Sequence, residues 1–219
     1  MIDRVFRGSR ELPAADARRR ELKHRLAAAV RRIVEDAALV DAAGAAADGD
    51  LETLIGGAEE LARRFEAVPS HREKGGLNYD ENEWEGALLE RSPISGHSNP
   101  LAAPLVIEDI DESGVLHATA TYGYAYEGPP GHLHGGCVAG AFDEMVGVGQ
   151  VAGGEMGYTG TLSIKMRRPT PLHTRIDYEA GVTNVDGRKI SVWSKSYARG
   201  DLLCEADALM ITPRERLSY

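Results

Sequence analysis

The sequence predicts an α+β fold, in which an antiparallel β-sheet wraps around one central helix and a helical extension precedes it. Three observations predict it. Residues 128–150 contain a turn and then a run of about 16 small or apolar residues, which indicates a buried helix. Two segments before this run and four after it have the composition and breaks of strands. Residues 13–68 instead repeat apolar side chains at helical spacing.

The N-terminal extension is predicted to be a helical hairpin over residues 1–68. Pro13 suits the first turn of a helix over 13–43. Its apolar stripe comprises Leu22, Leu26, Ala29, Val30, Ile33, Val34 and Ala37. Asp50 is the predicted N-cap of a second helix that ends before Pro69. Because acids flank the basic run 18–20, we interpret that run as a solvated helix face rather than a membrane or nucleic-acid patch.

Residues 69–100 are predicted to be a connecting segment, since they are rich in Gly, Asn, Ser, Glu and Pro, with Trp84 as the main apolar anchor. A turn-rich part spans residues 92–100. His97 lies in it, and a histidine without visible partners is interpreted as a surface or core-edge residue before a ligand contact.

Residues 101–219 are predicted to form the sheet domain. The expected strands are 105–109, 115–124, 159–166, 175–185, 189–199 and 202–212. Turn signals separate them at 111–114, 168–171, 186–187 and 200–201, and Gly153 and Gly154 end the central helix. The last four strands are expected to form a meander.

The central helix carries only two charges, Asp143 and Glu144. Acids are seldom buried unless they are paired or functional, so this position suggests chemistry. Gly135 and Asp143 can face one groove, yet eight residues of helix separate them by roughly 12 Å. One chain cannot bring both groups to one carbonyl. A catalytic site here therefore requires a homodimer, with two copies of the helix antiparallel across a twofold axis.

Acyl transfer is the chemistry that fits these residues. Glycines at a helix start, Gly135 and Gly136, leave N–H groups available at the positive end of the helix dipole, which suits an oxyanion. Asp143 can activate water or attack the carbonyl itself, and both routes stay open. In the plainer interpretation, the glycines only permit close packing and Asp143 is a satisfied interior acid.

These residues carry a family resemblance. The pattern Gly-Pro-Pro-Gly-x-x-His-Gly-Gly over 128–136, followed seven residues later by Asp143, resembles the hotdog-fold acyl-CoA thioesterases. The similarity is to the PaaI-like branch, which includes the vertebrate thioesterase-superfamily members, and it extends to about Thr212. It implies that the N–H of Gly135 or Gly136 polarises the thioester carbonyl and that Asp143 is the base or nucleophile.

The resemblance also implies supporting roles. His134 would orient the site, and a threonine on the next strand would help place the water. The best match is Thr159, with Thr161 one step along the same face. Some relatives carry an asparagine where Gly128 stands, so that side-chain contribution is either absent here or comes from another residue.

Basic residues at two places are the candidates for coenzyme A. Lys165 and Arg167 share a strand face and Arg168 begins the following turn, while Arg188 and Lys189 lie at another hairpin. The resemblance suggests that some of them meet the phosphates, while the pantetheine arm enters along the subunit interface. Arg167 and Arg168 are the preferred pair, because Arg offers a bidentate fork. An ordinary charged strand end is the alternative.

Composition limits the other classes of function. The 219 residues carry a net charge of −9, which argues against general nucleic-acid binding. Cys137 and Cys204 are the only cysteines, so they argue against a disulfide framework or a cysteine metal cluster and favour a reducing, cytoplasmic location. No signal peptide or membrane-spanning run is recognisable. No metal or cofactor is expected beyond coenzyme A as part of the substrate.

The sequence thus predicts an acyl-CoA thioesterase, as a homodimer with shared sites or a tetramer. Two alternatives remain. A hotdog dehydratase or hydratase usually pairs a histidine with an acid across the site, and the spacing of His134 and Asp143 favours hydrolysis. A non-catalytic acyl-CoA sensor would use the N-terminal hairpin as its output. The hairpin could equally pack on the catalytic domain, cover the acyl pocket or bind a partner.

Overall fold

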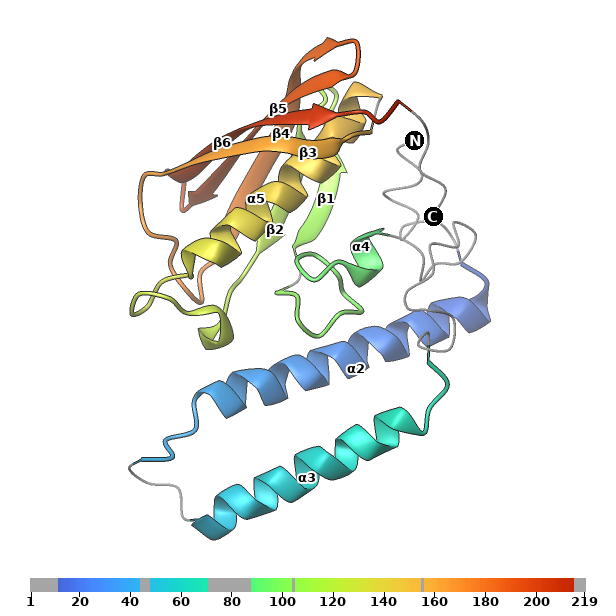
Figure 1. The fold of residues 1–219 in the computed structure, drawn as a ribbon, viewed down its shortest axis with the longest axis vertical. Helices are drawn as coiled ribbons and strands as arrows, with labels where there is room; N and C mark the ends of the chain where they lie inside the picture. The colour runs from blue at the N-terminus through green and yellow to red at the C-terminus, as the bar shows by residue number, and fades with distance from the viewer. Residues whose placement is uncertain (1–11, 44–47, 71–87, 104, 155, 215–219) are drawn as a thin grey trace.

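The computed structural model describes residues 12–43, 48–70, 88–103, 105–154 and 156–214, and these form a sheet domain with a helical extension (Figure 1). The sheet has six antiparallel strands, and one long helix lies across it. The predicted fold class is therefore confirmed. Trp84 and much of the predicted connecting segment lie outside the described residues.

The strands are β1 (Val106–Ile110), β2 (Leu116–Ala120), β3 (Tyr158–Met166), β4 (Ile176–Asp186), β5 (Lys189–Ala198) and β6 (Asp201–Ile211). Their order across the sheet is β1-β2-β4-β5-β6-β3. The expected four-strand meander is wrong in one respect, because β3 pairs with β6 and not with β4. β4 already has β2 and β5 as neighbours, so the strand that follows the helix joins the sheet at its far edge.

Turn chemistry forms the hairpins within one residue of the predicted places. Asp111 accepts backbone N–H groups from Ser113 and Val115 in the β1–β2 turn. Arg199 and Gly200 both have positive φ, at 53° and 85°, which matches a tight two-residue turn between β5 and β6. One strand is shorter than expected: β2 ends at Ala120, and the chain then forms a 3-10 turn, η4 (Tyr124–Tyr126).

The central helix is α5 (Gly135–Gly149), followed by a 3-10 turn, η5 (Gln150–Gly153). Its buried residues are Val138, Ala141, Phe142, Met145, Val146, Val148 and Gly149. They pack on the inner side chains of the sheet, including Leu116, Ile176 and Tyr178. At Gly149 the helix approaches the sheet so closely that a β-carbon would lie 2.8 Å from the Ala180 side chain. Burial of this face holds α5 against the sheet.

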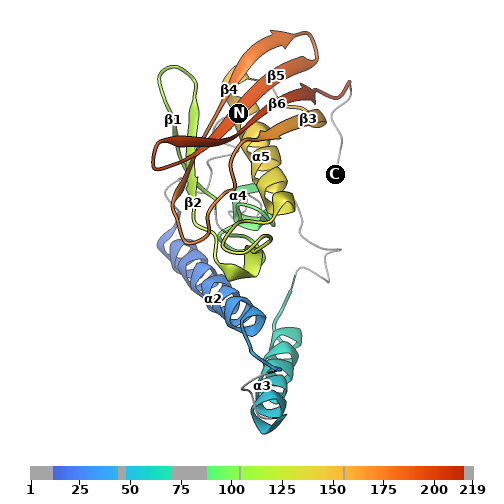
Figure 2. The ribbon, with the colours of Figure 1, turned by 90° about the vertical axis from the view of Figure 1, so that its left-hand side faces the viewer.

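The N-terminal extension contains α2 (Ala14–Ala38) and α3 (Asp48–Glu66), and a short helix, α4 (Leu88–Arg91), precedes the sheet domain. α2 lies beside the sheet domain, while α3 lies further away (Figures 1 and 2). Asp50 is not an N-cap as predicted, because α3 already begins at Asp48 and Asp50 lies in its first turn.

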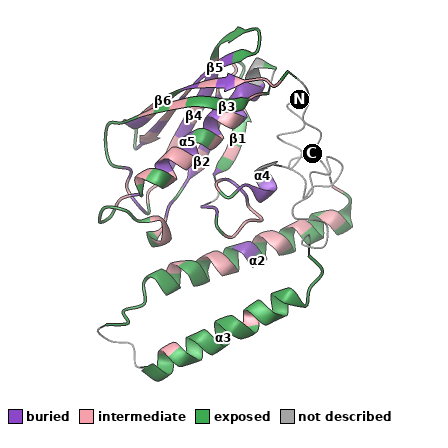
Figure 3. Ribbon diagram, in the orientation of Figure 1, coloured by how far each residue is buried: buried purple, intermediate pink, exposed green. Residues whose placement is uncertain are grey.

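The apolar stripe that predicted α2 is not the face that contacts the sheet domain. Leu26 on this stripe is 48% exposed, and Leu54 on α3 is 60% exposed. Within α3 no residue is buried, as Figure 3 shows. The contacting side of α2 instead carries the buried Ala27, flanked by half-buried polar side chains such as Arg20, Arg31 and Glu35. Among the helices in the described ranges, none is long and apolar enough to cross a membrane.

Candidate functional site

The site begins at the loop that leads into α5. Gly128 donates its N–H to the His132 carbonyl at 2.9 Å, and Leu133 donates to the Thr170 carbonyl at 2.9 Å. A β-carbon on Gly128 would lie 2.7 Å from the Cα of His134. The loop therefore has room only for glycine at position 128, where some relatives carry an asparagine.

His134 is the N-cap of α5. Its backbone is extended (φ −61°, ψ 137°), and its Nδ1 accepts the N–H of Gly136 at 3.0 Å. The N–H of Gly136 is therefore engaged by the cap. The N–H of Gly135, by contrast, donates to none of the residues that the structure describes. Of the two predicted oxyanion donors, the geometry leaves Gly135 available.

Asp143 lies on the outer face of α5, opposite the side packed on the sheet, and it is exposed in the single chain. The expectation of a wholly buried helix is therefore wrong on this face. The hydroxyl of Thr159 donates to Asp143 Oδ1 at 2.8 Å. The structure thus joins two of the predicted site residues, and it leaves Oδ2 of the carboxylate without a donor in the described part of the chain.

Thr161 does not share this contact. The pairing of β3 with β6 shifts between Thr159 and Thr161, which marks a bulge at Gly160. Thr161 is exposed and makes no hydrogen bond to Asp143. The strand therefore presents one hydroxyl, rather than two, to the carboxylate.

The two ends of the site are separate within one chain. A β-carbon at Gly135 would lie 3.8 Å from Met166, at the far end of β3 from Thr159. Asp143 lies eight residues further along α5, or roughly 12 Å along its axis. Gly135 and the Asp143–Thr159 pair therefore stand at opposite ends of one exposed strip formed by α5 and β3, as their spacing predicted.

The second acid of α5 behaves differently from the first. Glu144 is half-buried, and the buried hydroxyl of Ser95 donates to its carboxylate. The adjacent acids thus point to different surroundings: Asp143 is exposed beside β3, and Glu144 lies against the segment that precedes the sheet.

The predicted basic residues lie at the Gly135 end of β3, with Lys165 in the strand and Arg167 and Arg168 directly after it. Arg167 is 2.6 Å from Glu205, Lys165 is 3.6 Å from the same carboxylate, and Arg168 is 3.0 Å from Asp201. The hydrogen bond from Arg167 lowers the pKa of Glu205. All three basic side chains are more than half exposed, so these surface pairs are weak and can exchange for another anion.

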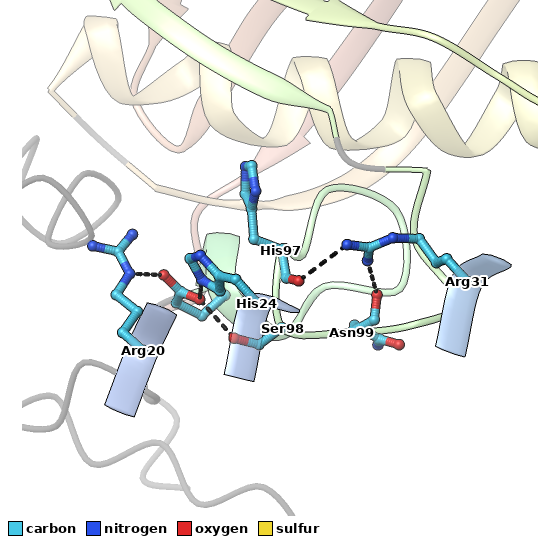
Figure 4. A network of polar contacts seen from close by, with 7 residues as sticks. Arg20, His24, Arg31, His97, Ser98 and Asn99 are labelled. Carbon is cyan, nitrogen blue, oxygen red and sulfur yellow. Dashed lines mark hydrogen bonds and ion pairs between the residues drawn. The ribbon is translucent and has the colours of Figure 1, made fainter. Parts of the chain in front are cut away.

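The sequence did not predict the buried polar cluster around Glu90. Glu90 is 2% exposed and binds Arg20 at 2.5 Å, His24 at 2.7 Å and the hydroxyl of Ser98 at 2.8 Å (Figure 4). Burial acts to raise the pKa of Glu90, but the hydrogen bonds from His24 and Ser98 and the charge of Arg20 lower it overall. The solvated-face prediction is wrong for Arg20, because its charge is paired with a buried acid.

His97 belongs to the same region. Its ring lies 5.3 Å from that of His24, at the contact with α2 and not beside Asp143. Burial, then repulsion from His24, lowers the pKa of His97. The core-edge interpretation of this histidine agrees with its place in the fold.

Comparison with known proteins places this geometry in context. No family model matches the chain. A curated acyl-coenzyme A thioesterase, THEM4 of Xenopus laevis, is 38% identical over 89 residues, which is 39% of this chain and 39% of that protein. The match thus spans about two-fifths of the length of that relative. A crystal structure of a thioesterase superfamily protein is 28% identical, with a TM-score of 0.71 over 86% of this chain and 94% of that chain.

The chain has the hotdog fold of the thioesterase superfamily. The similarity to the crystal structure of the thioesterase superfamily protein covers 86% of this chain, whereas residues after 100 make up little more than half of it. This similarity therefore extends into the N-terminal helices. A thioesterase protein with coenzyme A from Streptococcus pneumoniae is more distant, at 18% identity and a TM-score of 0.47 over 52% of this chain and 91% of that chain.

Proposed function

We propose that this protein is an acyl-CoA thioesterase, which hydrolyses an acyl-CoA thioester to a free acid and coenzyme A. The observation that carries the proposal is the pair of Asp143 and Thr159 on the open face of α5. A hydroxyl fixes one carboxylate oxygen and leaves the other for a water molecule or a carbonyl carbon. The thioesterase relatives support this choice of reaction.

The free N–H of Gly135 supplies the second requirement of the reaction. Asp143 of one chain takes a proton from water as the water oxygen bonds to the thioester carbon, and the Gly135 N–H of a second chain stabilises the resulting oxyanion. The tetrahedral intermediate then breaks its C–S bond, and the thiolate of coenzyme A leaves and takes up a proton. If Asp143 attacks instead, its oxygen forms an anhydride, which water opens. Coenzyme A enters only as part of the substrate.

We also propose the homodimer that this chemistry needs. Strand β3 is one of the two edge strands of the sheet, and most of its residues are exposed. Antiparallel pairing of two copies of β3, centred near Leu162 and Ser163, would set Thr159 of one chain opposite Met166 of the other. Gly135 lies beside Met166, so the partner's Asp143 would face it. A tetramer built from two such dimers is compatible with the same pairing.

For the coenzyme A moiety, we propose Arg167 and Arg168 as phosphate ligands. Both follow β3 at its Gly135 end, where the leaving group would exit, and both are exposed. Their present partners, Glu205 and Asp201, would yield to phosphate, because a dianionic group binds the guanidinium more strongly. The two free cysteines fit the cytoplasm as the proposed location.

The decisive experiment measures thiol release from short, medium, long and aromatic acyl-CoAs by the wild type, Asp143→Asn and Glu144→Gln. We expect Asp143→Asn to lose 10²-fold or more in kcat, as when a general base or nucleophile is removed, and Glu144→Gln to keep its kcat. The two variants remove the same charge from adjacent positions of α5, so the control is closely matched.

Other outcomes decide between functions. Wild-type protein that binds acyl-CoA without releasing thiol would favour the non-catalytic sensor. Release of water from a hydroxyacyl-CoA, with no thiol formed, would favour a dehydratase. Equal loss of kcat in both variants would show that the fold, and not the Asp143 carboxylate, was damaged.

A further inference from the structure

One carboxylate on α2 reaches across to the backbone of the sheet domain. Glu35 Oε1 accepts the N–H of Tyr124 at 2.6 Å, and its Oε2 accepts the N–H of Ala125 at 2.9 Å. These N–H groups open the η4 turn and have no partner within it. Glu35 is thus a bidentate cap, supplied from a residue 89 positions earlier in the chain.

The Glu35 carboxylate lies in close contact with Gly123. A β-carbon at this position would lie 2.7 Å from Oε2 and 2.8 Å from Cδ of Glu35. The backbone of Gly123 is extended (φ −96°, ψ −172°), so any residue could adopt its conformation. Space for the Glu35 carboxylate, rather than backbone freedom, is what glycine provides here.

The η4 turn is directly connected to the start of α5. The carbonyl of Tyr126, the last residue of η4, accepts the N–H of His134 at 2.9 Å. His134 in turn caps α5 by accepting the Gly136 N–H, which leaves the Gly135 N–H as the free donor. Two steps of hydrogen bonding therefore link Glu35 to the residue that presents the proposed oxyanion donor.

Further polar contacts fix α2 to the rest of the chain near the point where Glu35 binds η4. Arg31, one turn before Glu35, donates to the carbonyl of Asn99 at 2.9 Å and is half-buried (Figure 4). Further along the same side of α2, Arg20 and His24 bind the buried Glu90. These contacts fix α2 to the segment 90–99.

The segment 90–99 itself packs on the middle of α5. The hydroxyl of Ser95 donates to Glu144, and a β-carbon on Gly140 would lie 2.8 Å from Cδ1 of Ile94. α2 is therefore tied both to the turn before α5 and to a segment that supports its middle. Through these two contacts, α2 can fix the position of the loop before α5 relative to the middle of α5.

We propose that Glu35 is a positioning residue for the thioesterase site, which fixes η4 and His134 so that the Gly135 N–H points at the thioester oxygen. This inference rests on the proposed function. It gives the N-terminal helix a role in catalysis without any contact with the substrate. Misplacement of a catalytic group by about 1 Å can cost 10²-fold in rate, so even a small shift of this loop is measurable.

The kinetic test compares Glu35→Gln with Asp36→Asn. Both variants remove one negative charge from neighbouring positions on α2, but Asp36 is exposed. Glutamine offers only one acceptor oxygen to two N–H groups, so one hydrogen bond is lost. We expect kcat to fall about tenfold in Glu35→Gln with KM within twofold of the wild type, and both to be unchanged in Asp36→Asn. Equal kcat in the two variants would overturn the proposal.

A double-mutant cycle tests the path through Gly123. Alanine at position 123 would displace the Glu35 carboxylate, so Gly123→Ala should lose as much kcat as Glu35→Ala. The double variant should lose no more than either alone, because both changes remove the same contact. Losses that multiply would show that the two residues act separately, and the proposal would be wrong.

Amide hydrogen exchange tests the role of Glu35 without any substrate. In Glu35→Gln the backbone amides of His134 and Gly136 should exchange faster than in the wild type, and in Asp36→Asn they should not. Unchanged exchange at both amides would overturn the proposal, as would a Glu35→Gln protein that loses the fold of the sheet domain. If the wild type hydrolyses no acyl-CoA, the proposed function fails, while exchange still reports whether Glu35 holds the start of α5.

Discussion

Substitution of Gly135 by proline removes one hydrogen-bond donor and little else. Gly135 is the first residue of α5, where proline is well tolerated because its N–H is not used within the helix. His134 already has the extended backbone that a residue before proline prefers. A β-carbon at 135 meets only Met166, at 3.8 Å, which is ordinary contact. Loss of one oxyanion donor costs about 10² to 10³ in kcat, or roughly 2.7–4 kcal/mol, and we expect a loss in this range.

The assay is thiol release at saturating acyl-CoA, with the midpoint of thermal unfolding measured on the same protein. Gly135→Ala is the matched control, since it adds the same β-carbon and keeps the N–H. We expect Gly135→Ala to keep kcat within about threefold of the wild type, because the added carbon meets no close neighbour. A kcat for Gly135→Pro equal to that of Gly135→Ala, in folded protein, would refute Gly135 as the donor.

The same variant tests whether two chains share each site. Co-expressed Gly135→Pro and Asp143→Asn chains form mixed dimers, in which one site combines an intact Gly135 with an intact Asp143 from the other chain. Mixed dimers should therefore recover up to half of the wild-type activity, although each pure variant is nearly inactive. No recovery in isolated mixed dimers would contradict the antiparallel arrangement of the two helices.

Three further changes have definite expected outcomes. Thr159→Val removes the hydroxyl that binds Asp143 and should lower kcat about tenfold, whereas Thr161→Val should have no effect on thiol release, since Thr161 makes no such bond. Arg167→Ala should raise the KM for acyl-CoA with kcat retained, and an unchanged KM would exclude Arg167 as a phosphate ligand. Glu90→Gln should lower the free energy of unfolding by about 3 kcal/mol at pH 7, measured with urea, because it breaks a buried ion pair. Since the folded-state pKa of Glu90 lies below its usual 4.5, this contribution is present above about pH 4.5 and is lost as the pH falls further, so wild type and variant should converge in acid.

The sequence was informative where local rules act. Residues 111–114 and 199–201 carry the turn chemistry that the hairpins use, and the apolar run after Gly135 forms α5. The spacing of Gly135 and Asp143 also predicted that one chain leaves them apart. The pairing of β3 with β6 was not predictable in this way, because strand order depends on which edge is free after the other strands have paired.

The contact between α2 and the sheet domain was missed for a physical reason. Hydrophobic periodicity identifies the face of a helix that is apolar, and it takes that face to be the one that packs. α2 uses Arg20, Arg31 and Glu35 instead, on the opposite side from Leu26. Arg31 donates to the carbonyls of His97 and Asn99, Glu35 accepts two N–H groups, and Arg20 pairs with one buried acid. No pattern along the chain marks backbone groups as partners. These hydrogen bonds have a defined geometry, which is the property required of an element that positions a catalytic helix.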